Sequence, residues 1–469
     1  MLFLYIQLVH ELIILILLWF LFSKHGRRQF HTLRKSVKRS WQRQKDRRAR
    51  PLPSPPIAGR RDFLRSQWHP KTPHDCPHCC AGVKLQVARI NHHVTPWSQR
   101  KGKGGAKKEF DTRGFACLNT ACDYFGITDP AIHALVKDCD RGKDGDIPQL
   151  KCQCCKKRFS SHKGTPLYHL KKKAGDVEMV LWLRSVAEGV DLSVMVRYTG
   201  YSDATLARWL TRAGQHSTHL HELLFRGLIM PLVQMDELYA RVRGAASGRW
   251  LWMVIDPVSK ALPSIHLGGR KAEDGHALVH DFAQRLDPDC VPAVTTDGFR
   301  PYFSTLTAHF GKWFRPARAR KDHWQVDPRL LHGQLIKRRE RRTLTFTITR
   351  MRWGKRSELY QILEAQGFAR TIQTAFIERL NLTIRQGVSL LTRKTWSLAQ
   401  SDEHLLLHVQ WWRAYYHLLR EHESLRIPLP GYKRKHQART PAMALGLTDH
   451  VWTVGELLRL PLPPLEAAA

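Results

Sequence analysis

Cysteines and acidic residues are the side chains of this sequence whose spacing can support chemistry. Nine of the ten cysteines lie between Cys76 and Cys155, and only Cys290 stands apart. Clustered cysteines with CxxC-type spacing in a chain of this length indicate thiolate metal ligands in a reducing compartment, because a disulfide framework is typical of small secreted domains. We therefore expect a metal site in this region, and we expect Cys290 to be a small buried residue.

Two pairs of cysteines have the spacing of zinc-binding turns. They are Cys117-x4-Cys122 and Cys152-x2-Cys155. Zn²⁺ prefers four tetrahedral soft ligands, and two such turns supply two ligands each, as in zinc ribbons. We predict that these four cysteines hold one Zn²⁺ ion.

Three further cysteines leave the number of zinc sites open. They are Cys76, Cys79 and Cys80. Either they form a second site, completed by His74, His78 or Cys139, or they replace one of the two pairs in a single site. In both cases the zinc site is closed, so that the metal holds a fold and catalyses nothing.

Three carboxylates lie on segments that can bring them together. The stretch 228–270 alternates like antiparallel strands, and Asp236 lies in the middle of the first one. Asp297 follows a short apolar strand, and Glu378 lies on a strongly amphipathic helix within 371–391. Three converging carboxylates can hold two divalent metals ~3.5–4 Å apart, which clamp the attacking and leaving oxygens of a phosphodiester exchange. Mg²⁺ suits such a site because it prefers oxygen ligands and keeps open water positions.

Two other acidic residues near these carboxylates have simpler interpretations. Glu237 adjoins Asp236 but points to the opposite face of the strand, so we expect it at the rim or in a salt bridge. Asp256 precedes Pro257 at the end of a strand, which is typical of a turn.

The charge of the chain indicates the class of its partner. The 469 residues include 76 Lys and Arg against 40 Asp and Glu, a formal net charge of +36. Fifteen Trp and 43% hydrophobic residues can build a core, which excludes a wholly disordered basic tail. A surplus of this size argues for a polyanionic partner and fits neither small-molecule metabolism nor a multi-span membrane protein. We expect that partner to be nucleic acid.

The segment 176–226 predicts a helix-turn-helix unit. Asp176 can cap a first helix, and LSVMVRYT forms a short second helix that Gly200 ends. Ser202 caps a third helix, which Gly214 ends. The inward residues of the third helix are Leu206, Trp209, Leu210 and Ala213. Its outward residues are Asp203, Thr205, Arg208 and Arg212. The outward face suits a DNA major groove and its phosphates; the alternative is an ordinary three-helix bundle.

Two later features are expected to contact DNA as well. Asn381 and Arg385 follow Glu378 at i+3 and i+7, on the same helix face, where they can touch the DNA backbone. The stretch 309–342 carries eleven Lys and Arg but three acidic residues, interleaved with Trp313, Phe314 and Trp324. We interpret this stretch as a basic insert that lines the DNA path; the alternative is a solvated charged surface.

The N-terminus departs from this pattern. Residues 1–22 are interrupted only by Gln7, His10 and Glu11, and their length just suffices to span a bilayer as a helix. The twelve Lys and Arg that follow, up to Arg50, would keep the rest of the chain cytoplasmic. Either this stretch is a membrane tether, or translation starts further down and the stretch is an upstream extension.

Five motifs, in this order, resemble those of the DDE-type transposases of bacterial insertion sequences, closest to the group of the first-described insertion sequence. They are LKCQCCKKRFSSHKGTPLYHL, VQMDELYARV, VTTDGFRPYF, TAFIERLNLTIRQ and WWRAYYHLLREHESLR. The resemblance runs from about Cys117 to the end of the chain. It implies a multidomain α+β protein, in which a zinc ribbon and a helix-turn-helix precede an RNase H-like mixed α/β catalytic domain.

The resemblance also implies roles for single residues. The family's metal-binding triad would fall on Asp236, Asp297 and Glu378, with Mg²⁺ or Mn²⁺ as the metal, and its basic residue further along the helix would fall on Arg385. The sequence departs from the family in HLLREHESL, where Glu421 replaces a proline, and the apolar N-terminus has no counterpart that the resemblance would lead us to expect.

The expected organisation follows from these observations. The modules are an apolar helix at 1–22, a basic linker at 23–70, a cysteine-rich zinc-binding region at 71–170, a helix-turn-helix at 176–226, a catalytic domain at 228–426 with its insert at 309–342, and a C-terminal tail at 427–469. The expected function is transposition: the protein binds double-stranded DNA at the element ends, cleaves it and joins it to target DNA. A homo-oligomer at synapsis and a cytoplasmic, nucleoid-associated location are expected too. The alternatives are a catalytically inactive DNA-binding regulator descended from such an element, and a nuclease without strand transfer.

Overall fold

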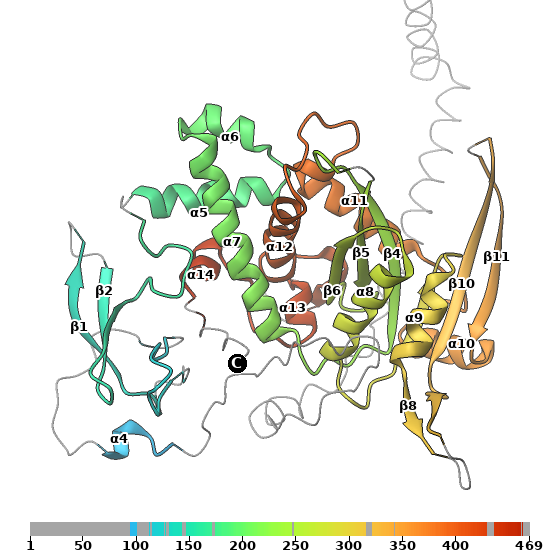
Figure 1. The fold of residues 1–469 in the computed structure, drawn as a ribbon, viewed down its shortest axis with the longest axis horizontal. Coiled ribbons are helices and arrows are strands. Elements are labelled where there is room, and N and C mark those ends of the chain that lie inside the picture. The colour runs from blue at the N-terminus through green and yellow to red at the C-terminus, as the bar shows by residue number, and fades with distance from the viewer. Residues whose placement is uncertain are drawn as a thin grey trace, which may run out of the picture. The chain divides into compact units, whose positions relative to one another are not determined.

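The computed structural model shows a mixed α/β protein built around a mixed sheet (Figure 1). The structure describes residues 94–100, 112, 115–125, 127, 131–142, 147–170, 174–245, 248–315, 321–341, 343–428, 436–460 and 462. The segments 1–22 and 23–70, and the cysteines and histidines between 74 and 80, lie outside the described residues, so what was predicted of them stays a prediction. In the described part of the chain, no helix is long and apolar enough to cross a membrane.

The cysteine-rich region contains a small sheet with its own core. Strands β1 (Leu135–Arg141), β2 (Ile147–Cys152) and β3 (Arg158–Ser160) pair antiparallel in the order β1-β2-β3. The short helix α4 (Trp97–Arg100) precedes them in the chain. The core of this region consists mainly of Cys117, Cys122, Tyr124, Ile127, Leu135, Leu150 and Cys152.

Three helices follow, largely as the sequence predicts. They are α5 (Ala174–Ala187), α6 (Leu192–Thr199) and α7 (Asp203–Leu224). Helix α6 covers the predicted residues and ends at Gly200, whose φ of 72° is the left-handed conformation that glycine adopts without strain. The side chain of Ser202 caps α7 as predicted. Helix α5 begins at Ala174, before the predicted cap Asp176.

The predicted end of the third helix at Gly214 is wrong, because α7 continues to Leu224. A Cβ atom added to Gly214 would lie 2.5 Å from the backbone oxygen of Leu407, in helix α12 (Asp402–Leu418). Gly214 is therefore a packing residue that lets α7 and α12 approach closely, and it does not end the helix.

The main sheet has six strands in the order β11-β10-β7-β4-β5-β6. The strands are β4 (Leu232–Ala240), β5 (Arg249–Ile255), β6 (Ser264–Gly268), β7 (Ala293–Thr296), β10 (Leu331–Glu340) and β11 (Thr343–Trp353). Strands β4, β5 and β6 form the predicted antiparallel meander. Strand β7 pairs parallel with both β4 and β10, and β10 forms an antiparallel hairpin with β11.

Helices cover both faces of this sheet (Figure 1). On β5, Trp252 and Val254 belong to one core, which includes α8 (Ala272–Arg285) and α9 (Pro301–His309). The alternate residues Leu251, Met253 and Ile255 belong to another core, which includes α11 (Ala375–Gly387) and α12. Side chains alternate between the two faces along a strand. A strand that is buried on both faces therefore has a sequence that is apolar without interruption. Helix α10 (Arg356–Ala365) packs near β10.

The C-terminal segment contributes to the helical core. Helices α13 (Pro441–Ala444) and α14 (Val454–Arg459) lie in the segment that was predicted as a tail. Residues of α14, among them Leu457 and Leu458, are fully buried in the same core as Trp182. This part of 427–469 is therefore folded onto the helices of the predicted helix-turn-helix. A hairpin of β8 (Gly311–Phe314) and β9 (His323–Val326) and a β12–β13 pair at 427–428 and 436–437 complete the strands.

Gly214→Ala should destabilise the protein by about 1–3 kcal/mol, although alanine is normally the better helix former. The added Cβ would overlap the backbone of Leu407, and backbone cannot move aside as a flexible side chain can. Urea unfolding would measure the loss, with Gln215→Ala on the exposed side of the same helix as the control, expected within about 0.5 kcal/mol of wild type. A more stable Gly214→Ala protein would contradict the close packing of α7 and α12.

Candidate functional site

Two of the three predicted carboxylates are brought together by the pairing of β4 with β7. In this parallel pair Met235 lies opposite Thr296, and Asp236 and Asp297 are the residues that follow each of them. Carboxylate oxygens of Asp236, Asp297 and Glu237 all lie within 4.8 Å of one another. These three residues are called the acidic group below.

Glu237 is the member of the acidic group whose closeness the sequence did not predict. Its buried carboxylate accepts hydrogen bonds from Arg270 Nε and Tyr302 Oη, both at 3.0 Å. The predicted salt bridge is therefore present, with Arg270 as the partner. Burial raises the pKa of Glu237, as does Asp297, while Arg270 opposes the rise. Its position next to Asp236 in the sequence was the only available signal.

Glu378, the third predicted carboxylate, is not part of the acidic group. Its Oε1 accepts a hydrogen bond from Thr374 Oγ1 at 2.5 Å and pairs with the ammonium group of Lys337, from β10. The structure therefore places Glu378 on the predicted helix but gives it a basic partner.

Asn381, one turn after Glu378, makes the contact between α11 and the acidic group. Its Nδ2 donates a hydrogen bond to Asp236 Oδ2 at 2.8 Å. Its Oδ1 is buried and accepts no hydrogen bond from the described residues. A buried acceptor without a donor is costly, so an atom or ion not provided by the chain would be favourable here.

Gln234 fixes the helix that carries Glu378 and Asn381. It lies on β4 two residues before Asp236, on the same face, and is almost fully buried. Its Oε1 accepts hydrogen bonds from the backbone N–H groups of Phe376 and Ile377, both at 3.0 Å, and its Nε2 donates to Gln373 O at 2.7 Å. A strand side chain thus takes the place of an N-cap residue, because the side chain of Thr374 does not cap α11. No sequence signal pointed to this role.

Arg385 fixes the C-terminal end of the same helix. Its guanidinium donates to Leu391 O at 2.8 Å and to Tyr239 O, at the end of β4, at 3.3 Å. Arg385, whose contact with DNA stays a prediction, therefore holds α11 against β4.

The acidic group is electrostatically unfavourable by itself. Burial raises the pKa of Asp236 to about 7, and the negative charges of Glu237 and Asp297 add to the rise. Like charges held this close cannot all ionise freely without a compensating cation. Oxygen ligands from carboxylates and from the Asn381 amide are those that Mg²⁺ and Mn²⁺ prefer, so the residues fit such an ion.

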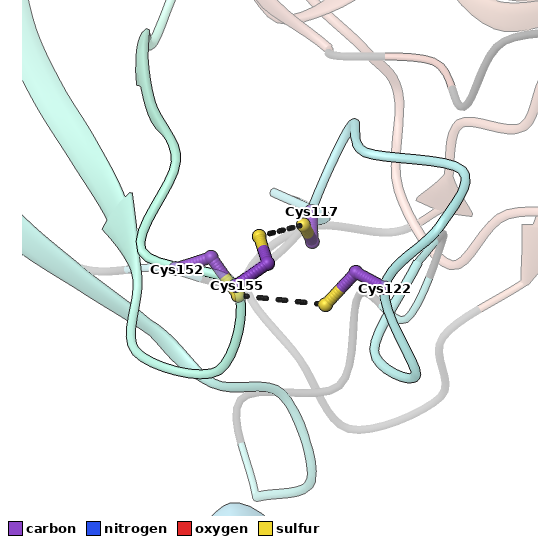
Figure 2. Close-up of side chains that lie close together, drawn as sticks. All are labelled: Cys117, Cys122, Cys152 and Cys155. Atoms are coloured by element: carbon purple, nitrogen blue, oxygen red, sulfur yellow. Dashed lines mark hydrogen bonds between the residues drawn. The ribbon is translucent and has the colours of Figure 1, made fainter.

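The four predicted cysteines converge in the second group that could hold a metal (Figure 2). The Sγ atoms of Cys117 and Cys155 are 3.7 Å apart, and those of Cys122 and Cys152 are 3.8 Å apart. Four sulfurs placed tetrahedrally at about 2.3 Å from Zn²⁺ are separated by about 3.8 Å, so the spacing fits this ion.

The charge of the cysteine group also favours a cation. Burial raises the pKa of Cys122 to about 12, whereas a hydrogen bond from Cys117 lowers the pKa of Cys152 to about 5. The four sulfurs thus do not all become thiolates unless a positive charge is added. Cys139 and Cys154 lie outside this group in the described structure, and the half-buried Cys290 accepts a hydrogen bond from Met230 N at 3.3 Å.

The other residues predicted to contact DNA lie in different surroundings. Arg208 is exposed on α7, whereas the guanidinium of Arg212 donates to Tyr168 O at 2.8 Å and to Pro166 O at 3.3 Å. The predicted basic insert 309–342 is not a single insertion outside the main sheet. It contains the separate β8–β9 hairpin, and then β10, which is a strand of the main sheet. Trp313 on β8 is 49% exposed.

Asp236→Asn should stabilise the metal-free protein by about 1–3 kcal/mol at pH 8. The raised pKa means that ionising Asp236 in the folded protein costs free energy: the cost begins as the pH rises above the unfolded value of 3.8 and reaches its full size above about pH 7. The gain should therefore shrink between pH 7 and pH 4. Thermal unfolding in buffers stripped of free divalent ions would measure it. Added Mg²⁺ should raise the melting temperature of the wild type and not of the variant; an equal rise in both would refute binding at Asp236.

Cys152→Ser should reduce the zinc content of the purified protein by about one equivalent per chain, because Cys152 is one of the four converging ligands. Cys154→Ser is the matched control, since Cys154 is in the same turn but outside the group. Metal analysis by mass spectrometry would decide between them. Loss of zinc in both variants, or in neither, would rule out this ligand set.

No protein-family model matches this chain, and no curated protein matches it either. The chemistry of the acidic group and of the four cysteines is therefore the basis for inferring what the protein does.

Proposed function

We propose that the chain is a DDE-type transposase of a bacterial insertion sequence. It would bind the ends of its element and catalyse metal-dependent cleavage and strand transfer of DNA. The observation that carries this proposal is the meeting of Asp236, in the middle of β4, with Asp297, directly after the parallel strand β7, beside the helix of Glu378 and Asn381. Three of the motifs that resemble the family, VQMDELYARV, VTTDGFRPYF and TAFIERLNLTIRQ, contain these residues.

The form of the main sheet supports an RNase H-like catalytic domain. An antiparallel meander, β4-β5-β6, continues through parallel strands β7 and β10, and the acidic residues lie on the first strand and directly after β7. Fold alone does not imply an activity, so the proposal depends on the acidic group and not on the sheet.

The residues of the site have separable roles in the proposed reaction. Asp236 and Asp297 would hold Mg²⁺ or Mn²⁺, which when bound activates water and stabilises the leaving oxygen of a phosphodiester. Asn381 orients the Asp236 carboxylate through its hydrogen bond. Glu378 would complete the ligand set by leaving Lys337, and Lys337 would then be free to pair with a DNA phosphate.

The preceding modules would select the DNA. A zinc ribbon formed by Cys117, Cys122, Cys152 and Cys155 would hold the fold of the cysteine-rich region. The helices α5, α6 and α7 would form the helix-turn-helix, with the exposed Arg208 available to a phosphate or a base edge. The proposal includes a homo-oligomer that joins two element ends and a cytoplasmic, nucleoid-associated location.

A second candidate function is a catalytically inactive DNA-binding regulator. The pairing of Glu378 with Lys337 favours it, because a carboxylate neutralised by lysine is a poorer metal ligand. The two candidates differ in chemistry and not in DNA binding, so only an assay of strand cleavage and joining separates them.

The purified chain should cleave and join labelled DNA from the element ends when Mg²⁺ or Mn²⁺ is supplied. Asp297→Ala should lower the rate on the order of a thousandfold or more, because it removes a ligand of the reacting centre. Asp289→Ala, an exposed acidic residue shortly before β7, is the control and should react like the wild type.

DNA binding without cleavage, by protein shown to be folded and to carry zinc, would replace the transposase with the inactive regulator. Cleavage without joining would indicate a nuclease.

A further inference from the structure

The loop between α11 and α12 presents an aromatic side chain to solvent. It follows the short helix η2 (Ser389–Leu391) and leads to the cap of α12 at Ser401. Within it, Trp396 is 100% exposed. Leaving so much apolar surface in water forgoes the gain of burial, so a single fully exposed tryptophan suggests a binding partner.

The loop is held in place although Trp396 is exposed. Ser397 Oγ donates a hydrogen bond to Asp191 Oδ2, and Thr392 Oγ1 donates to Arg385 O at 3.0 Å. Arg243 N donates to Ala399 O at 2.8 Å, and Ala399 is fully buried. Contacts on both sides of Trp396 therefore fix the backbone, and the ring projects from an anchored loop.

The charge around Trp396 selects an anionic partner. Arg393 and Lys394 precede it and are exposed, and residues 388–401 contain no Asp or Glu. The carboxylate in direct contact with the loop, Asp191, is engaged by Ser397. An aromatic face beside two cations suits a nucleotide, whose base can stack while its phosphate pairs with the cations.

The loop is also connected to the acidic group by continuous structure. Helix α11 lies against β4: Asn381, in the middle of the helix, is bonded to Asp236, and Arg385, in its last turn, is bonded to Tyr239 O. Just beyond β4, Val242 forms a bridge with Ala399 of the loop. Six residues of extended chain from Asp236 to Val242 span about 20 Å, or about six base steps along DNA.

We propose that Trp396 is a stacking site for an unpaired base of a DNA strand that runs from the acidic group along α11. Arg393 and Lys394 hold the phosphates on either side of that base. The site would bind DNA ends with a single-stranded overhang better than blunt duplex ends, because only an unpaired base exposes both faces for stacking. Its link to strand transfer rests on the proposed function, whereas the binding itself does not require catalysis.

Binding of two DNA duplexes by the full-length chain tests this site. One duplex is blunt, and the other carries a short 3′ overhang with 2-aminopurine, whose fluorescence falls when the base stacks. The measurement is made in Ca²⁺, so that binding is observed without cleavage. The wild type should prefer the overhang and quench its fluorescence. Trp396→Ala should reduce that preference by about fivefold to a hundredfold and abolish the quenching, while Trp396→Phe retains most of both.

Phe346→Ala is the matched control, because Phe346 is an exposed aromatic residue on β11, outside the segments expected to contact DNA, and its loss should leave the preference unchanged. Equal affinity of the wild type for both duplexes would overturn the proposal, and so would equal losses for both in Trp396→Ala. Unchanged DNA binding together with a change of oligomeric state in Trp396→Ala would also overturn it and assign the tryptophan to a protein interface. Overhang binding that depends on Trp396 in a protein that never cleaves DNA would preserve this inference and refute the transposase.

Discussion

The parallel pairing of β4 with β7 is the constraint on which the candidate active site depends. Four residue pairs from Leu232–Ala293 to Met235–Thr296 fix the register, so the next residue of each strand is a carboxylate. Backbone hydrogen bonds and the cores on both faces hold this register, and none of them involves the carboxylates themselves. The fold therefore supplies the free energy that keeps the acidic group together; burial first, and then the charges of Glu237 and Asp297, raise the pKa of Asp236.

Helix α11 determines where the polar residues around the acidic group lie. Its apolar stripe, which includes Ile377, Leu380 and Ile384, is buried against the sheet and fixes the rotation of the helix. Gln234 fixes where the helix begins, and Arg385 ties its last turn to the end of β4. Because the rotation of α11 and its first residue are both fixed, two residues three positions apart contact different groups. Asn381 donates a hydrogen bond to Asp236, while Glu378 forms an ion pair with Lys337 of β10.

The sequence predicted the features that local patterns determine. The strand meander, the short second helix with its Gly200 cap, and the buried stripe of α11 follow from residue periodicity and cap chemistry, and the structure confirms them. The four cysteines, whose spacing is local within each pair, converge as predicted.

Features that depend on distant contacts were not predicted. Gly214 reads as a helix end in the sequence, and only the backbone of Leu407 explains why it lies within a helix. In the sequence Lys337 is one of eleven basic residues of the predicted insert, and nothing local indicates that its strand, β10, pairs with β7. Helices α13 and α14 contain only four and six residues, too few to form without the core that they complete.

The acidic group is negatively charged, whereas the chain as a whole is strongly positive, and this difference helps to separate the two candidate functions. A net charge of +36 attracts a phosphate backbone from a distance, but the acidic group would repel a phosphodiester at close range. A regulator needs only the first effect and gains nothing from keeping Asp236, Glu237 and Asp297 together, since their repulsion lowers its stability. Arg270 neutralises Glu237 alone, and Lys337 neutralises Glu378, which leaves Asp236 and Asp297 without a basic partner among the ion pairs of the described structure. A divalent cation would lift both the internal repulsion and the repulsion of DNA, so the two carboxylates without a basic partner are those that catalysis would use.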